Sequence, residues 1–247
     1  MSREASTTAE YTVADQRRMQ AARRYFAWQA RLATEQIGRR VVEIGCGLGN
    51  FTEHLLDREQ IIALDVVEDC LDHLRGRFPS RANLVARRMD VQDPEFRELA
   101  RYRPDTVVCL NVLEHVRDDR LALEHMHYVL DPGGRAVFIL PAFESLYGPI
   151  DHNLGHFRRY SKGHWRALAE AVGFRIRQSH YLNSVGLIGW WLNAKVLKKT
   201  EQSEAQIALF DSLIVPPLSR LERWIEPPFG QSIFTVLEKP APRRSPF

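Results

Sequence analysis

The stretch Val41-Val-Glu-Ile-Gly-Cys-Gly-Leu-Gly-Asn50 decides the fold. A short apolar run leads into glycines at positions 45, 47 and 49, and Asn50 opens a segment that we expect to be helical. Glycine has no Cβ atom, so this turn can bend tightly and a ligand can approach its backbone closely. A pyrophosphate-binding turn would need glycine at position 50, whereas the carboxylate of Glu43 suits a cationic ligand.

Short apolar segments recur after this turn, with helical patterns between them. Buried strands that alternate with helices are typical of a parallel sheet covered on both faces, so we predict an α/β fold. The sheet is expected to have seven strands, with a helical insertion before the last one. The expected strands are residues 41–44, 61–64, 83–86, 106–110, 135–140, 174–181 and 232–237.

The helices are predicted from apolar spacing and from end signals. Ser161 is expected to cap a helix that Gly173 ends, and Asp131-Pro-Gly-Gly134 stops the one before it. The expected helical segments are residues 14–37, 50–58, a stretch after the second strand up to residue 78, 118–130, 161–171 and two within 182–226.

Composition excludes several classes of protein. The 247 residues are 45% hydrophobic, 26% charged and 10% aromatic, which are ordinary globular values and exclude a disordered or disulfide-stapled chain. The formal charge of +3 does not by itself indicate nucleic-acid binding. The start of the chain is too polar for a signal peptide, and the apolar stretch 185–192 is too short to span a bilayer. We therefore expect a soluble, cytoplasmic protein.

Polar residues stand where the predicted strands end. Asp65 follows the second strand, 20 residues after Gly45, where a carboxylate can accept hydrogen bonds from both hydroxyls of a ribose. Asp90 with Val91 follows the third strand, and Asn111 follows the fourth. Open α/β sheets bind their ligands at these carboxyl ends.

The chain resembles a class I S-adenosylmethionine-dependent methyltransferase of the ubiquinone-biosynthesis-like branch, over residues 37–180 and the strand at 232–237. The resemblance implies a Rossmann-like, doubly wound, seven-stranded sheet, mostly parallel with an antiparallel last strand. It also implies S-adenosylmethionine as the cofactor. The cofactor-binding residues would be Glu43, Gly45 and Gly47 at the loop, Asp65 on the ribose, Val66 and Val91 on adenine, Asp90 at its amino group, and Asn111 under the methionine part.

The expected organisation has a cofactor-binding core and additions. An N-terminal lead and helix would cover residues 1–37, and residues 240–247 would be a tail. The methyltransferase domain would take residues 38–181 and 231–239. Residues 182–230 would form a helical cover beside the acceptor site, with more apolar bulk than a solvated helix requires.

Two groups of residues are candidates for the acceptor side. His115, in Asn111-Val-Leu-Glu-His-Val116, follows the fourth strand; alternatively, Glu114 or His115 caps the next helix. The second group follows the fifth strand, within residues 147–160. There we expect His156 as the base, with Tyr160 as a further catalytic candidate. Tyr147, His152, Arg158 and Arg159 would contact the acceptor, unless the arginines pair with acids to fix the loop.

The function predicted from these residues is methyl transfer from S-adenosylmethionine to a small-molecule acceptor, anionic or linked to a lipid or sugar, most readily at oxygen. A histidine near the donor favours an alcohol or phenol acceptor, because such groups gain from a base. N- or C-methylation, or a protein or RNA acceptor, is the alternative. No metal site and no nucleic-acid partner are expected. A peripheral contact with a membrane surface, and a monomer or a homodimer, are left open.

Overall fold

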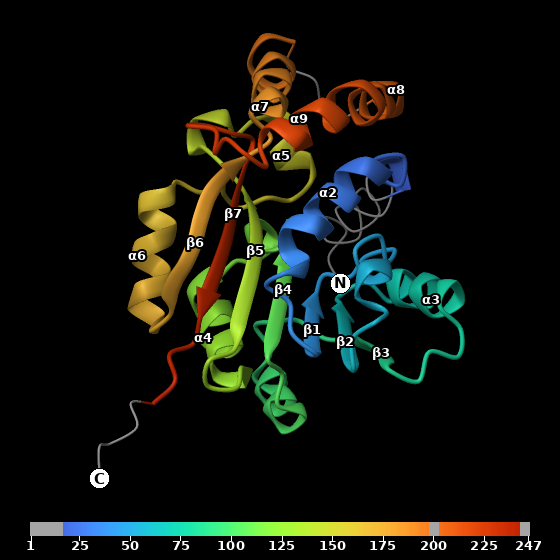
Figure 1. Cartoon of the computed structure of the whole chain (residues 1–247), viewed down its shortest axis with the longest axis vertical. Coiled ribbons are helices and arrows are strands. Elements are labelled where there is room, and N and C mark those ends of the chain that lie inside the picture. The colour runs from blue at the N-terminus through green and yellow to red at the C-terminus, as the bar shows by residue number, and fades with distance from the viewer. Residues whose placement is uncertain (1–16, 198–202, 243–247) are drawn as a thin grey trace.

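The structure is a computed structural model that describes residues 17–197 and 203–242. Its centre is a seven-stranded sheet in the order β3-β2-β1-β4-β5-β7-β6, in which β7 runs antiparallel to both of its neighbours (Figure 1). The predicted mixed sheet with an antiparallel last strand is therefore confirmed. The strands are β1 (Arg40–Ile44), β2 (Gln60–Asp65), β3 (Leu84–Arg88), β4 (Thr106–Leu110), β5 (Arg135–Pro141), β6 (Arg175–Leu182) and β7 (Ser232–Glu238).

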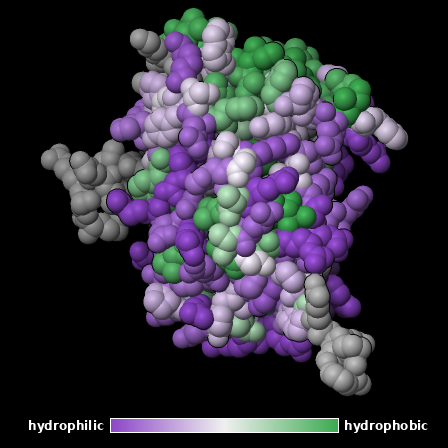
Figure 2. Space-filling model, turned by 90° about the vertical axis from the view of Figure 1, so that its left-hand side faces the viewer, coloured by the Kyte–Doolittle hydropathy of each residue, from purple (hydrophilic) through white to green (hydrophobic). Residues whose placement is uncertain are grey.

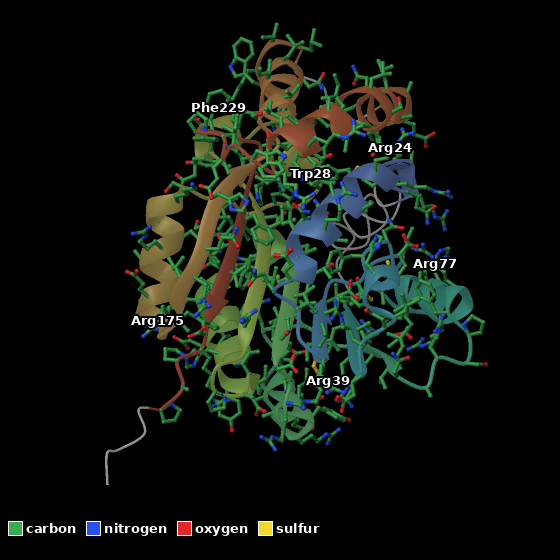
Figure 3. All side chains as sticks on the ribbon, in the orientation of Figure 1. Arg24, Trp28, Arg39, Arg77, Arg175 and Phe229 are labelled. Atoms are coloured by element: carbon green, nitrogen blue, oxygen red, sulfur yellow. The ribbon has the colours of Figure 1, made fainter. Side chains whose placement is uncertain are left out.

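Helices cover both faces of the sheet. On one face the strands pack against η2 (Pro94–Tyr102), α4 (Asp119–Val129) and α6 (Lys162–Val172). On the other they pack against α2 (Arg23–Thr34), α3 (Glu68–Arg77) and α9 (Val215–Leu221). Trp28 of α2, labelled in Figure 3, is buried on this second face. The alternation of buried residues along β1, β4 and β5 between the two cores explains why these strands are apolar throughout.

Several helix ends follow the predicted signals. The Ser161 hydroxyl accepts a hydrogen bond from the backbone N–H of His164, and Gly173 ends α6 with φ +103°. Asp118 caps α4 by accepting from the backbone N–H of Leu121 at 2.9 Å. The alternative that Glu114 or His115 caps this helix is therefore wrong; both lie in the separate turn η3 (Leu113–His115).

Two of the predicted helices are shorter in the structure than expected. Residues 50–58 form only the short 3₁₀ turn η1 (Thr52–Leu55), because the Thr52 hydroxyl donates to Glu43 and Phe51 and Leu55 are buried against the sheet. The expected helix from residue 14 is broken at residues 20–22, before α2 begins. Residues 1–16 and 243–247, which include the predicted lead and most of the tail, lie outside the described residues.

The segment after β5 contains two short helical turns, η4 (Glu144–Leu146) and α5 (Pro149–Asn153). Its ends are fixed to the sheet, because Phe143 N–H donates to the Tyr160 carbonyl and Tyr160 N–H donates to the Pro141 carbonyl.

The segment between β6 and β7 consists of helices with π-helical turns, which we call the cover. Its parts lie together at one end of the sheet (Figure 1). Among the described residues no helix is long and apolar enough to cross a membrane. The elements are α7 (Ser184–Trp191), η5 (Leu192–Val196), α8 (Glu204–Leu209), η6 (Phe210–Ile214) and α9.

Candidate active site

A cavity of about 2100 Å³ lies at the carboxyl ends of β1, β2 and β4. This is where the strand order of an open α/β sheet reverses and where such sheets bind ligands. Its wall is formed by the glycine loop after β1, by η3, by the segment 147–159, by α2 and by the cover. Of the predicted site residues it includes Glu43, Gly45, Gly47, Asp65, Val66, Asp90, Val91, Asn111, His115, Tyr147, His152, His156 and Arg159.

The glycine loop has a backbone that side chains would not tolerate. Gly45, Gly47 and Gly49 have φ values of +71°, +51° and +79°, in the region that favours glycine. A Cβ atom at Gly45 would also lie 2.3 Å from Val112, and one at Gly49 would lie 2.5 Å from Leu74. Gly45 and Gly47 line the cavity, and because they carry no side chains a ligand can lie against the backbone of the loop there.

Asp65 holds this loop through hydrogen bonds and can still accept further hydrogen bonds from a ligand. One carboxylate oxygen accepts the N–H of Gly47 and the other accepts that of Val67, both at 2.9 Å. A carboxylate has about four acceptor positions, so two remain for ribose hydroxyls. Burial raises the pKa of Asp65, although the backbone N–H groups oppose this shift. The adjacent Val66 is 52% exposed and offers an apolar surface on the cavity wall.

Glu43 is buried beneath the loop. Its carboxyl accepts the Thr52 hydroxyl at 2.7 Å, and burial raises its pKa to about 8. Asp90 accepts the backbone N–H of Gln92 at 2.8 Å, and Val91 beside it is buried. Asn111 follows β4 with φ +53° and is exposed on the cavity wall. These cavity-lining residues, with the open glycine loop, fit S-adenosylmethionine.

The acceptor side is built around Asp151, which is completely buried on α5. Its Oδ1 lies 2.8 Å from Nδ1 of His156 and accepts the Nε–H of Arg159 at the same distance. Burial would raise the pKa of Asp151, but these two partners outweigh burial and hold it below the ordinary value. An ionised carboxylate can only accept, so Nδ1 of His156 donates to Asp151, and in the neutral ring the lone pair then lies on Nε2.

Hydrogen bonds bring the two predicted histidines together. The N–H of Phe157 donates to the Glu114 carbonyl at 2.7 Å, which fixes the segment after α5 against η3. The His115 and His156 rings then lie edge to face, with their centroids 4.6 Å apart. Burial, together with His156, lowers the pKa of His115 to about 3.

Glu114 was not among the predicted site residues. Its side chain lines the cavity but is only 1% exposed, and its Oε2 has no hydrogen-bond partner among the residues that the structure describes. Burial raises its pKa to about 7. Ligand atoms of Glu114, His115 and His156 lie within 4.8 Å of one another, so these three side chains could hold a metal ion. The sequence spacing gave no sign of this group, because His156 comes from a distant segment.

Five other predicted residues have different surroundings. Tyr160 and Arg158 do not line the cavity: the Tyr160 hydroxyl lies within hydrogen-bond distance of the Leu113 carbonyl and of the Asp119 carboxylate, and Arg158 pairs with Asp119 at 2.7 Å. Arg159 lines the cavity but is bound to Asp151, as in the structural alternative for the arginines. Tyr147 donates its hydroxyl to the His156 carbonyl at 2.7 Å, and His152 is exposed on the cavity wall.

Comparison with known families identifies the chain. The model of a family described as a methyltransferase domain matches residues 16–179. The chain belongs to this family. The match confirms the predicted methyltransferase class and S-adenosylmethionine as the cofactor that such a domain uses.

Two curated relatives carry related names. A probable S-adenosylmethionine-dependent methyltransferase of Mycolicibacterium smegmatis is 29% identical over 64% of this chain and 60% of its own length. A ubiquinone biosynthesis O-methyltransferase of Idiomarina loihiensis is 32% identical over 41% of this chain and 42% of its own. The chain thus spans about half the length of the curated relatives that it matches.

Solved structures support the fold. The methyltransferase in a Haloferax volcanii complex with the activator Trm112 is 17% identical, with a TM-score of 0.65 over 97% of this chain and 99% of that one. A Bacillus halodurans methyltransferase is also 17% identical, with a TM-score of 0.55 over 83% of this chain and 94% of that one. At these identities the likeness concerns the Rossmann-like fold alone.

Proposed function

We propose that this protein transfers the methyl group of S-adenosylmethionine to an oxygen atom of a small-molecule acceptor, with His156 as the general base. One observation carries the proposal: the glycine loop with Asp65 lines the same cavity as His156, whose ring is held from behind by the buried Asp151. We assign the donor to Glu43, Asp65, Val66, Asp90 and Val91, and the acceptor hydroxyl to the neighbourhood of His156.

For methyl transfer to oxygen, the protein must align the acceptor with the methyl group and remove the acceptor's proton. When bound, S-adenosylmethionine supplies a methyl group on a positively charged sulfur, which is already activated for displacement. The cavity wall must hold the acceptor oxygen in line and exclude water, and alignment contributes several kcal/mol. An alcohol or phenol must also lose its proton, and a positioned base accelerates this step.

His156 is suited to accept that proton. Asp151 holds Nδ1, so the free lone pair of Nε2 is available to the acceptor hydroxyl. Once Nε2 is protonated, the negative charge of Asp151 stabilises the imidazolium, as in a Ser-His-Asp triad. Arg159 holds Asp151 in place by donating its Nε–H to the same oxygen, Oδ1. His115, with its lowered pKa, is the weaker base and packs against the His156 ring.

The first prediction concerns His156. Replacing His156→Gln removes the base, so kcat should fall about 10²–10⁴-fold, and the affinity for S-adenosylhomocysteine in calorimetry should stay unchanged. His73→Gln, on the exposed surface of α3, is the matched control and should keep full activity. An unchanged rate for His156→Gln would show that no base is used there, and would favour an acceptor atom that is already nucleophilic: nitrogen, sulfur or carbon.

A divalent cation is the second candidate for activating the acceptor oxygen. Glu114, His115 and His156 could together hold such a cation, which would bind the oxygen. We favour the base, because Asp151 already fixes the tautomer that proton transfer needs. The second prediction is therefore that dialysis against EDTA leaves kcat unchanged. A loss of activity that added Mg²⁺ or Zn²⁺ restores would overturn the base in favour of the cation.

A further inference from the structure

The cavity extends well beyond the donor loop, into a region beneath the cover. Ligand pockets of this kind commonly measure about 300–1,000 Å³, and this one measures about 2100 Å³. A donor at the glycine loop and an acceptor hydroxyl at His156 occupy the end formed by the sheet. The wall of the remaining space is formed by the cover and by α2. We call this space the cover chamber.

The cover chamber is lined mostly by apolar groups. Among the described residues of the cover, the single charged side chain on its wall is Asp211. Its carboxylate is turned to α2, where it accepts the backbone N–H of Tyr25 at 2.8 Å and that of Arg24 at 3.2 Å. The apolar lining residues are Trp190, Leu192, Leu197, Ile207, Leu209, Phe210, Leu213 and Ile214. This wall suits a hydrocarbon chain and offers no cationic partner for a phosphate.

The chamber reaches the surface through side chains that are themselves exposed. Leu192, Leu197, Leu209 and Leu213 line the cavity and are 44–62% exposed. Their surroundings are also apolar, since Ile188, Trp191 and Val196 are half exposed or more. Figure 2 shows apolar residues gathered at the end of the molecule where the cover lies in Figure 1. An amphiphilic molecule could therefore enter the chamber directly from an apolar phase.

We propose that the cover chamber binds the hydrocarbon chain of an amphiphilic acceptor, whose hydroxyl end then lies at His156. The position of the hydroxyl end rests on the proposed function. The site for the hydrocarbon chain is inferred from the cavity wall alone. The proposal narrows the acceptor class to molecules with a polar head and a long apolar tail.

Gly189 provides a direct way to block the chamber. It lies within α7, lines the cavity, and a Cβ atom added there would meet nothing within 4 Å. Gly189→Phe should therefore fold and add a ring to the wall of the chamber. Gly163→Phe is the matched control, because Gly163 also lies in a helix with open space around its Cβ position, on α6 and away from the cavity.

The test is calorimetric titration with hexyl, octyl and decyl glucoside, each kept below its micellar concentration, without the methyl donor. For the wild type and Gly163→Phe, affinity should rise about fourfold per added methylene group. Gly189→Phe should lose this dependence on chain length while its affinity for S-adenosylhomocysteine stays unchanged. Leu197→Asn, which adds a polar group to the mouth, should reduce the dependence as well.

Equal chain-length dependence in the wild type and Gly189→Phe would overturn the proposal, because the alkyl chain would then bind elsewhere. The absence of any dependence in the wild type would overturn it too. Repeating the titration with decyl glucoside embedded in phosphatidylcholine vesicles distinguishes a chain taken from a bilayer from one taken from solution. Since no methyl transfer is measured, the outcome is independent of the His156 test.

Discussion

Glu43 shows how burial can prepare a residue for a charged ligand. Burial raises its pKa to about 8, with Asp65 contributing in the same direction against the hydrogen bond from Thr52. Below that pH the free protein holds Glu43 mostly protonated. A cationic ligand at the loop favours the ionised form, so binding of the ligand should release a proton.

This linkage gives the third prediction. Calorimetry with S-adenosylmethionine at pH 7, without an acceptor and in two buffers of different ionisation enthalpy, should show proton release for the wild type and little or none for Glu43→Gln. The affinity of the wild type relative to Glu43→Gln should rise with pH up to about 8 and then level off, because the ionised form binds the cation better. Equal proton release from both proteins would show that Glu43 does not sense the ligand.

At the scale of elements, the cover and α2 are joined through Asp211. The N-cap residue of α2, Ala22, has no side chain able to cap, and the carboxylate of Asp211 accepts two N–H groups of the first turn instead. The negative charge also suits the positive end of the helix dipole. Residues at opposite ends of the sequence thereby close one side of the cavity.

The fourth prediction tests this contact. Asp211→Ala should lower the free energy of unfolding by about 1–2 kcal/mol, as for the loss of a helix cap, measured by urea denaturation. Asp57→Ala, which removes a carboxylate at the exposed surface, should change it by less than about 0.5 kcal/mol. If the two variants were equally stable, Asp211 would contribute nothing to holding the cover on α2.

Local patterns in the sequence predict the sheet and the donor end well. The central strands β1, β4 and β5 are apolar on both faces, and Gly45, Asp65 and Asp90 stand at strand ends, where topology brings them together. Contacts between distant segments were not predictable in this way. The Asp151–His156 pair depends on how α5 folds back, and the Asp211 cap joins residues 186 positions apart. The expected helix at 50–58 is short because packing and the Glu43 contact override local propensity.

At the scale of the whole molecule, three parts of the chain converge on one cavity. The sheet provides the donor end, the segment after β5 provides His156 and Asp151, and the cover with α2 encloses the rest. The family match reaches residue 179, and the cover begins after it. The glycine loop and α2 thus come from the part of the chain shared with the family, whereas the cover, which forms the other wall of the cover chamber, comes from the part beyond the match.

The most direct measurement is transfer of an isotopically labelled methyl group. The protein is incubated with S-adenosylmethionine that carries a trideuterated methyl group, together with a metabolite and lipid extract, and products are analysed by mass spectrometry. We predict a labelled product that forms with the wild type, with its label on oxygen, and that is strongly reduced with Asp65→Ala, which loses donor contacts. Two results would contradict methyl transfer at this site. In one, the wild type binds S-adenosylhomocysteine but labels nothing in the extract. In the other, the Asp65→Ala variant forms as much labelled product as the wild type.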